Sequence, residues 1–303
     1  MFIKDKIRGI IFGAALGDAL GGPLEFLSQE EILGKYGVVD DMVGGGWLDL
    51  EPGETTDDTA MTVCVIKGIL ENWDSPIYHI GKYFMSWFDT QPKDIGITTK
   101  YALESYKIFG DWLQAGERAH DASGGKSAGN GTLMRCAPIA FLYKDDYDKM
   151  IELTAAQSKM THYDDLAVQA CCIYNHIIWE LIHNKDLKKS IKNALQRYDS
   201  EDQYGDCLEG TLKYEDLKPT GFVVDTLRCS LYSLLDTEDY FDAVVMAVNM
   251  GGDADTIGAV TGGLAGAYYG YESLPAIWVY QLKCFDELDD LSRECLKRLD
   301  KRK

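Results

Sequence analysis

The stretch NMGGDADTIGAVTGGLAGAYYG, residues 249–270, decides the fold that we expect for this chain. Its glycines recur every four residues, at Gly258, Gly262, Gly266 and Gly270. The segment 9–21 repeats this spacing, at Gly9, Gly13, Gly17 and Gly21. A glycine inside a helix costs about 1 kcal/mol relative to alanine, so a regular stripe indicates that another backbone packs closely there. We therefore predict that helices over 4–20 and 254–270 pack antiparallel, which would bring Glu25 beside Asp255.

The remainder of the chain also shows helical periodicity and few alternating runs, so we expect an all-α fold. Apolar residues follow helical spacing over 57–72, 76–89, 97–109, 131–142, 146–159, 164–184, 187–197, 223–236, 239–250 and 285–299. The acidic, polar stretch 198–218 is interpreted as a surface excursion. Because no change in composition marks a linker, we predict a single compact multi-helix domain over 1–303.

The composition excludes several classes of function. The 303 residues carry a formal net charge of −19, which opposes binding to nucleic acid and to anionic membranes. No apolar run reaches the length of a membrane span. The eight cysteines include no CxxC pair and are interpreted as buried thiols, which favours a reducing, cytoplasmic location. The N-terminus imitates a signal peptide, but Asp18 interrupts its apolar part; we expect Asp18 to be a buried hydrogen-bond acceptor.

Two acidic clusters stand at the starts of helical segments. Their oxygen-bearing side chains are Thr56, Asp57 and Asp58 in the first cluster and Asp253, Asp255 and Thr256 in the second. A helix N-cap needs only one acceptor, and four carboxylates brought together would repel one another without a cation. An all-oxygen ligand set favours Mg²⁺, Mn²⁺ or Ca²⁺ over Zn²⁺. Two pairs of aspartates suit two ions, but the N-cap interpretation stays open because the sequence does not show that the clusters meet.

The glycine-rich segment GGKSAGNGTLMR, residues 124–135, is the third candidate element. It fails the Walker A pattern because His120 stands where the leading glycine is required, and Met134 replaces the last glycine of the Rossmann pattern. What remains is a flexible loop that runs into a helix, and its backbone amides can bind an anion. An ordinary surface loop is the alternative interpretation.

Six motifs in chain order resemble the ADP-ribosylglycohydrolase family, in particular its bacterial members similar to dinitrogenase reductase-activating glycohydrolase. They are GAALGDALGGPLEF (13–26), TTDDTAMT (55–62), GNGTLMRCAPIA (129–140), THYDD (161–165), GFVVDTL (221–227) and the stretch 249–270. The resemblance implies an all-α enzyme with two Mg²⁺ or Mn²⁺ ions in a cleft. It also implies the reaction: hydrolysis of the glycosidic bond between ADP-ribose and a modified protein side chain, most often arginine, with ADP-ribose as product.

The resemblance also implies roles for single residues. The six residues of the acidic clusters match metal ligands, and Glu25 matches a glutamate beside the metals. Glu25, Asp58 and Asp255 are therefore the catalytic candidates. The positions that match substrate contacts are Ser127, Gly129, Asn130, Gly131, His162 and Phe222. Phe222 stands where related bacterial sequences often have tyrosine, so the acceptor of ADP-ribose stays open, as does the choice between Mg²⁺ and Mn²⁺.

Other classes of protein fit the sequence less well. His120 and Asp121 form an HD pair, but the remaining histidines lack companion acids of the HD phosphohydrolase pattern. Terpenoid synthases use DDxxD, whereas Met61 occupies the last position of this pattern here. The alternatives are a non-catalytic binder of ADP-ribose, an immunity-type relative, or a hydrolase that acts on another ADP-ribosyl linkage or on a small molecule. The intact set of acids argues against a loss of catalysis.

Overall fold

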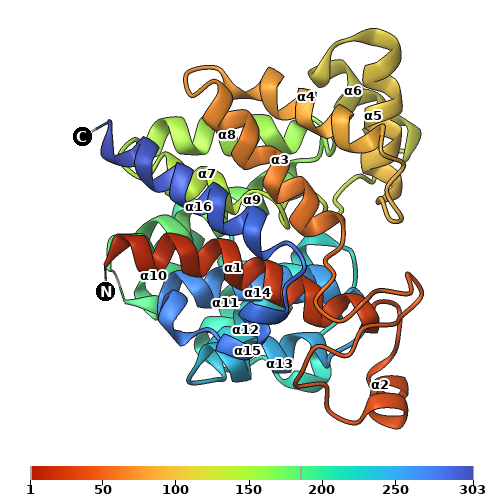
Figure 1. The fold of residues 1–303 in the computed structure, drawn as a ribbon, viewed down its shortest axis with the longest axis vertical. Helices are drawn as coiled ribbons and strands as arrows, with labels where there is room; N and C mark the ends of the chain where they lie inside the picture. Colours follow the sequence, from red (N-terminus) through yellow and green to blue (C-terminus); the bar gives the residue numbers. More distant parts are fainter. Residues whose placement is uncertain (1, 185, 303) are drawn as a thin grey trace.

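Helices α1 (Ile3–Gly21) and α14 (Ala254–Tyr269) lie against each other in the centre of the protein, as Figure 1 shows for the computed structural model, which describes residues 2–184 and 186–302. A Cβ atom added to Gly17 would lie 1.9 Å from the carbonyl oxygen of Gly258, and one added to Gly21 would lie 2.3 Å from that of Ala254. Residues later in α1 therefore contact residues earlier in α14. The predicted antiparallel packing is confirmed.

The described residues form sixteen α-helices and three short 3₁₀ helices without a β-strand, which confirms the predicted all-α fold. Besides α1 and α14, the helices are α2 (Gln29–Tyr36), α3 (Asp57–Glu71), α4 (Pro76–Phe88), α5 (Ile97–Phe109), α6 (Trp112–Ala122), α7 (Ala137–Leu142), α8 (Tyr147–Lys159), α9 (Asp165–Ile182), α10 (Leu187–Arg197), α11 (Glu201–Glu209), α12 (Val223–Leu235), α13 (Tyr240–Val248), α15 (Ala276–Gln281), α16 (Phe285–Asp300), η1 (Gly22–Leu24), η2 (Tyr214–Asp216) and η3 (Tyr271–Ser273). Met1, Lys185 and Lys303, which the predicted domain includes, lie outside the described residues.

Parts of the helix prediction are wrong. The segment 131–142 is helical only from Ala137 onward, because Pro138 is accommodated in the first turn of a helix and not in its interior. Helices α2, α6, α11 and α15 were not predicted. The stretch 198–218 contains α11, which buries Tyr204 and Cys207, so it is more than a surface excursion.

The remaining helices pack around the central pair. Figure 1 shows α4, α5 and α6 together at the upper right, while α16 lies near α1 and α3, and both chain ends lie on the left. All eight cysteines are free and seven are buried, as predicted. None of the described helices has the length and apolar character needed to cross a membrane.

The contact between α1 and α14 predicts that alanine destabilises the protein at Gly17 but not at Gly34. Gly17→Ala should lower the free energy of unfolding by roughly 1–3 kcal/mol, because the new methyl group collides with the backbone of α14. Gly34→Ala is the matched control, since Gly34 lies in α2 and a Cβ there meets nothing within 4 Å. This control should be neutral or slightly stabilising. Urea unfolding followed by circular dichroism measures both, and equal stability of the two variants would contradict the close contact.

Candidate active site

The loop that precedes α14 is pressed against the segment that follows α1. Gly252 donates its N–H to the carbonyl oxygen of Leu27 at 2.7 Å, and the N–H of Phe26 donates to the Gly252 carbonyl at 2.7 Å. Gly252 has a φ of +63°, and a Cβ there would lie 1.8 Å from the carbonyl oxygen of Pro219, so only glycine fits this position. The two segments are thereby joined, and carboxylate oxygens of Glu25, Asp253 and Asp255 all lie within 4.8 Å of one another.

Asp18 holds the first acidic cluster in place. Its buried carboxylate accepts hydrogen bonds from the backbone N–H of Thr56 at 3.0 Å and of Thr59 at 3.0 Å. These N–H groups lie at the start of α3, where helical partners are missing. Asp18 is the buried acceptor that the sequence predicted. Because it lies on α1, the same helix orients both Glu25 and the start of α3.

The two acidic clusters meet. Thr256 donates its hydroxyl to Asp58 Oδ2 at 3.3 Å, although 198 residues separate them. Thr56 caps α3 by accepting from the N–H of Asp58 at 3.4 Å. Asp253 occupies the N-cap position of α14, but its side chain accepts no hydrogen bond from that helix; its Oδ2 accepts from Asn130 Nδ2 at 2.8 Å. The N-cap interpretation therefore holds for Thr56 and is wrong for Asp253.

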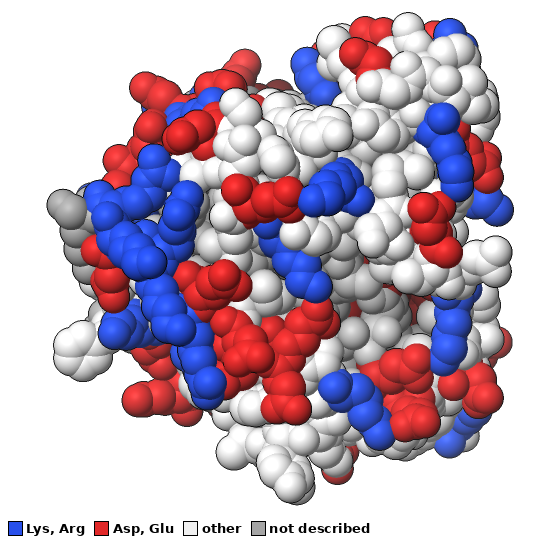
Figure 2. Space-filling view, turned by 45° about the horizontal axis from the view of Figure 1, so that its top comes forward, with Lys and Arg blue, Asp and Glu red and all other residues white. Residues whose placement is uncertain are grey.

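A cavity of about 560 Å³ opens over the two clusters. Six carboxylates line it, and no lysine or arginine is among its described lining residues. The complete lining comprises Glu25, Phe26, Trp47, Asp57, Asp58, Asp94, Ile95, Gly96, Ile97, Thr98, Thr99, Gly129, Asn130, Gly131, Met134, His162, Gly221, Asp253, Asp255 and Thr256. Basic side chains gather instead on α16, which carries Arg293, Lys297 and Arg298 and is followed by Lys301; Figure 2 shows a gathering of Lys and Arg at the left.

Burial and mutual repulsion disfavour the charged forms of these acids. Burial, followed by the neighbouring carboxylates, raises the pKa of Asp57, Asp58 and Asp255 well above the usual range. Burial likewise raises the pKa of Glu25 to about 8 and that of Asp18 to about 6. Such shifts indicate that a positive charge is needed here for all of the carboxylates to ionise at neutral pH.

The donor set fits a hard divalent cation. Asp58 Oδ1 is buried and has no hydrogen-bond partner among the described residues, which is costly for a carboxylate unless an ion contacts it. Every carboxyl and hydroxyl group of the two clusters offers oxygen, the ligand atom that Mg²⁺, Mn²⁺ and Ca²⁺ prefer. The residues present can therefore hold a metal, since carboxylate oxygens of Glu25, Asp253 and Asp255 lie close enough together to share one ion.

The fold and this acidic cavity agree with comparisons to known proteins. The family model described as ADP-ribosylglycohydrolase matches residues 2–303. The chain belongs to the ADP-ribosylglycohydrolase family. It is 31% identical to ADP-ribosyl-[dinitrogen reductase] glycohydrolase of Rhodospirillum rubrum, over 92% of this chain and 91% of the relative. It is 30% identical to ADP-ribosylarginine hydrolase Tri1 of Serratia proteamaculans, over 96% of this chain and 78% of the relative.

A solved structure extends this agreement to the fold. The structure titled "ADP-ribosylglycohydrolase-related protein complex" superposes with a TM-score of 0.83 at 30% identity and covers 98% of both chains. These findings confirm the predicted family and enzyme class, a glycosidic-bond hydrolase.

Three features of this ADP-ribosylglycohydrolase cavity were missed by the sequence analysis. Asp94 adds a carboxylate, and burial raises its pKa. Trp47 donates its indole N–H to Glu25 Oε2 at 2.6 Å. The first turn of α5 contributes Thr98 and Thr99. All three lie in or next to loops without periodicity, and the only signal was the isolated acid in QPKDIG, residues 91–96.

Four of the six predicted substrate contacts line the cavity, and two do not. Gly129, Asn130, Gly131 and His162 line the cavity, whereas Ser127 is not among the lining residues. Ser127 is buried, and its hydroxyl lies 2.7 Å from His120 Nδ1. Phe222 also lies outside the lining but pairs with Gly129 through an isolated β-bridge; its side chain is 41% exposed. Their contact with substrate therefore stays a prediction.

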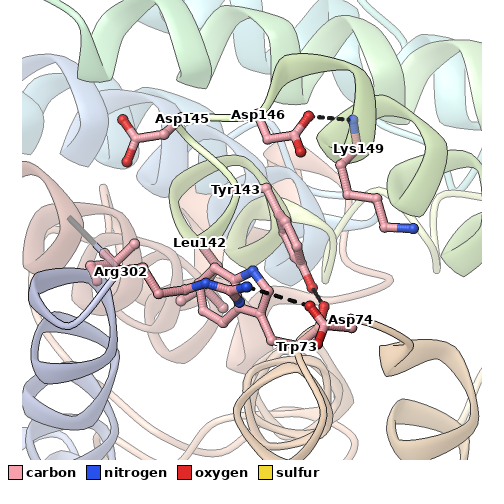
Figure 3. A pocket seen from close by; sticks show the side chains of 9 residues that line it. Trp73, Asp74, Leu142, Tyr143, Asp145, Asp146, Lys149 and Arg302 are labelled. Atoms are coloured by element: carbon pink, nitrogen blue, oxygen red, sulfur yellow. Dashed lines mark hydrogen bonds and ion pairs between the residues drawn. The ribbon is translucent and has the colours of Figure 1, made fainter.

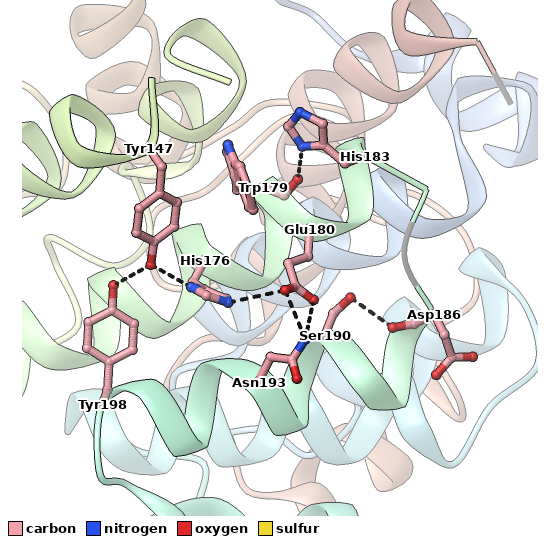
Figure 4. Close-up of polar contacts among 9 residues, drawn as sticks. All are labelled: Tyr147, His176, Trp179, Glu180, His183, Asp186, Ser190, Asn193 and Tyr198. Carbon is pink, nitrogen blue, oxygen red and sulfur yellow. Dashed lines mark hydrogen bonds and ion pairs between the residues drawn. The ribbon is translucent and has the colours of Figure 1, made fainter. Parts of the chain in front are cut away.

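In two other polar clusters of the ADP-ribosylglycohydrolase chain, acids are paired with neighbouring side chains. Figure 4 shows the buried Glu180, which accepts two hydrogen bonds from Asn193, at 2.9 and 3.0 Å, and faces His176 at 3.6 Å. Figure 3 shows a pocket of about 300 Å³ in which Arg302 lies 4.7 Å from the ring centre of Trp73 and pairs with Asp74 at 3.4 Å. Neither cluster leaves an acid unpaired in the way that the cavity leaves Asp58 Oδ1.

The raised pKa values predict how the metal-free protein responds to pH. Folding moves Asp18 from its ordinary pKa of 3.8 to about 6 and Glu25 from 4.5 to about 8. Between these values the folded chain binds more protons than the unfolded chain, so stability should fall as pH rises from about 4 to 8. Urea unfolding in EDTA at several pH values measures this slope.

Glu25→Gln provides the control for this prediction, because it removes one of the acids with a raised pKa while keeping the side-chain shape. Its stability should fall less steeply between about pH 5 and 8 than that of the wild type, and added Mg²⁺ or Mn²⁺ should reduce the loss in the wild type. Parallel slopes for the two proteins would contradict the raised pKa of Glu25.

Proposed function

We propose that the protein is a divalent-cation-dependent hydrolase that releases ADP-ribose from modified arginine side chains of a protein and thereby reverses ADP-ribosylation. The observation that carries this proposal is the acidic cavity, in which two oxygen-rich clusters from distant parts of the chain meet. Thr56, Asp57 and Asp58 on one side, and Asp253, Asp255 and Thr256 on the other, would hold two Mg²⁺ or Mn²⁺ ions.

Arginine suits this cavity as the acceptor residue. Six carboxylates without a lysine or arginine among the described lining residues create a negative field, which attracts a guanidinium group. The names of two relatives point the same way, since one is an ADP-ribosylarginine hydrolase and another acts on ADP-ribosyl-dinitrogen reductase. We therefore propose ADP-ribosyl-arginine on a protein surface as the substrate.

The diphosphate of ADP-ribose needs donors other than basic side chains in this cavity. Gly96 is the N-cap of α5 and makes no side-chain cap bond, and Ile97, Thr98 and Thr99 of the first turn line the cavity. The backbone N–H groups of a first helical turn attract phosphate oxygens. Asn130 is less available, because its N–H donates to Gly221 and its side chain donates to Asp253 and Thr226.

Cleavage at the anomeric carbon passes through a cation-like transition state, which carboxylates stabilise. Bound divalent cations would lower the pKa of a water molecule and orient the ribose hydroxyls. Glu25 is positioned to handle a proton: one of its oxygens accepts from Trp47, and its carboxyl group lies beside Asp253 and Asp255. In the metal-free chain burial raises the pKa of Glu25 to about 8, and a bound cation would lower this pKa and favour the carboxylate that can accept a proton.

Removal of one ligand from either cluster should abolish activity. Asp57→Ala and Asp255→Ala should each reduce Mg²⁺- or Mn²⁺-dependent release of ADP-ribose from an ADP-ribosyl-arginine peptide to the level of an EDTA-treated control, since both carboxylates line the cavity. Mass spectrometry measures the product, and circular dichroism should show unchanged helix content. Asp40→Ala removes an exposed acid outside the cavity and should keep full activity.

Two results would change the conclusion. Full activity of either ligand variant would rule out the proposed metal site. Retention of the ADP-ribosyl peptide by the wild-type protein without any release of ADP-ribose would show a binding protein instead of an enzyme.

A further inference from the structure

Arg135 is a buried cation whose partners are neutral. Its side chain is 0% exposed, and it donates from Nε to Gln157 Oε1 at 2.7 Å and from NH2 to Thr161 Oγ1 at 2.8 Å. Its guanidinium carbon lies 4.6 Å from the ring centre of Phe84. Among the described residues it forms no ion pair within 4.0 Å. A guanidinium group can only donate, so Thr161 is the acceptor in its contact with Arg135.

The hydroxyl of Thr161 has a second contact, with His162 Nδ1 at 2.9 Å. Thr161 is 0% exposed, and within the described part of the chain its hydroxyl contacts only Arg135 and His162. A hydroxyl carries one hydrogen, and a buried O–H without an acceptor is unfavourable. Thr161 therefore donates to His162 Nδ1, and the neutral imidazole carries its own hydrogen on Nε2.

The Nε2 edge of His162 faces two glycines of the cavity wall. A Cβ added to Gly129 would lie 3.0 Å from Nε2, and one added to Gly131 would lie 3.1 Å from Cε1. All three residues line the cavity, and the missing side chains leave this edge of the ring uncovered. Burial, with a smaller contribution from the charge of Arg135, lowers the pKa of His162 to about 3, so the ring is neutral at physiological pH.

We propose that Arg135 and Thr161 hold His162 in its Nε2–H tautomer, so that the imidazole donates a hydrogen bond to an oxygen of the ligand. Neither Arg135 nor Thr161 is among the residues that line the cavity; both are positioning residues that act through His162. The identity of the ligand rests on the proposed function, whereas the tautomer is a property of the ligand-free chain.

Nitrogen-15 NMR of histidine-labelled protein reads the tautomer directly. The chain contains five histidines, and the signals that disappear in His162→Phe identify those of His162. In the ligand-free wild type, Nε2 should give the signal of a protonated nitrogen and Nδ1 that of an unprotonated one, without a change between about pH 5 and 8. A protonated Nδ1, or a mixture of tautomers, would overturn the proposal.

Substitutions at Thr161 separate positioning from folding. Thr161→Val removes the hydroxyl but keeps the side-chain shape, and it should broaden or mix the tautomer signals of His162 and weaken ADP-ribose binding by roughly 3- to 10-fold in the presence of Mg²⁺. Thr161→Ser keeps the hydroxyl and should restore both. Thr154→Val is the matched control, because Thr154 is equally buried and bonds to Met150 and Asn175; it should leave the His162 signals unchanged.

Calorimetry with ADP-ribose distinguishes a failure of the proposed role of Thr161 from a failure of the proposed function. Wild-type affinity in Thr161→Val, together with an unchanged tautomer, would overturn the role of Thr161. An absence of ADP-ribose binding to the wild-type protein would contradict the proposed function, and the NMR signals of the ligand-free chain would still decide whether Arg135 and Thr161 set the tautomer.

Discussion

Carbonyl oxygens of α14 occupy the space that side chains on α1 would need, as at Gly17 and Gly258. Backbones this close have few alternative registers, because a shift by one residue would place a methyl or larger group against a carbonyl. The register in turn places Glu25, which follows α1, beside Asp255, which opens α14. The same helix α1 carries Asp18, which holds the start of α3. One contact between two helices thus orients both halves of the acidic site.

The charge balance of the site follows from this arrangement. Six carboxylates share the cavity, and the fully buried Arg135 bonds only to neutral groups. Its guanidinium does not line the cavity and pairs with none of the carboxylates, although its charge contributes to the lowered pKa of His162. This balance supports the proposal that the compensating positive charge comes from bound metal ions or from the guanidinium group of a modified arginine.

The parts of this site that follow from local sequence patterns could be predicted from the sequence. The glycine spacing of residues 9–21 and 258–270 was enough to predict the pairing of α1 with α14, and acids at helix starts were enough to predict the two clusters. Asp94 and Trp47 could not be predicted, because their places depend on how irregular loops close over the cavity. Arg135 looked like part of a helix over 131–142, whereas the turn ahead of Pro138 leaves it free to reach Thr161.

Several locally unfavourable features lie at the cavity or in the helices that lead to it. Interior glycines weaken α1 and α14, buried acids resist ionisation, and Asp58 keeps a carboxylate oxygen without a partner. Glu180 shows that the same fold can satisfy a buried acid where nothing is to be bound, since Asn193 donates to both of its oxygens. Residues that are locally destabilising are retained where the binding of a ligand compensates for their cost. Among the described carboxylate oxygens, Asp58 Oδ1 is the buried one without a hydrogen-bond partner, and this distinguishes the acid at the cavity from the paired Glu180.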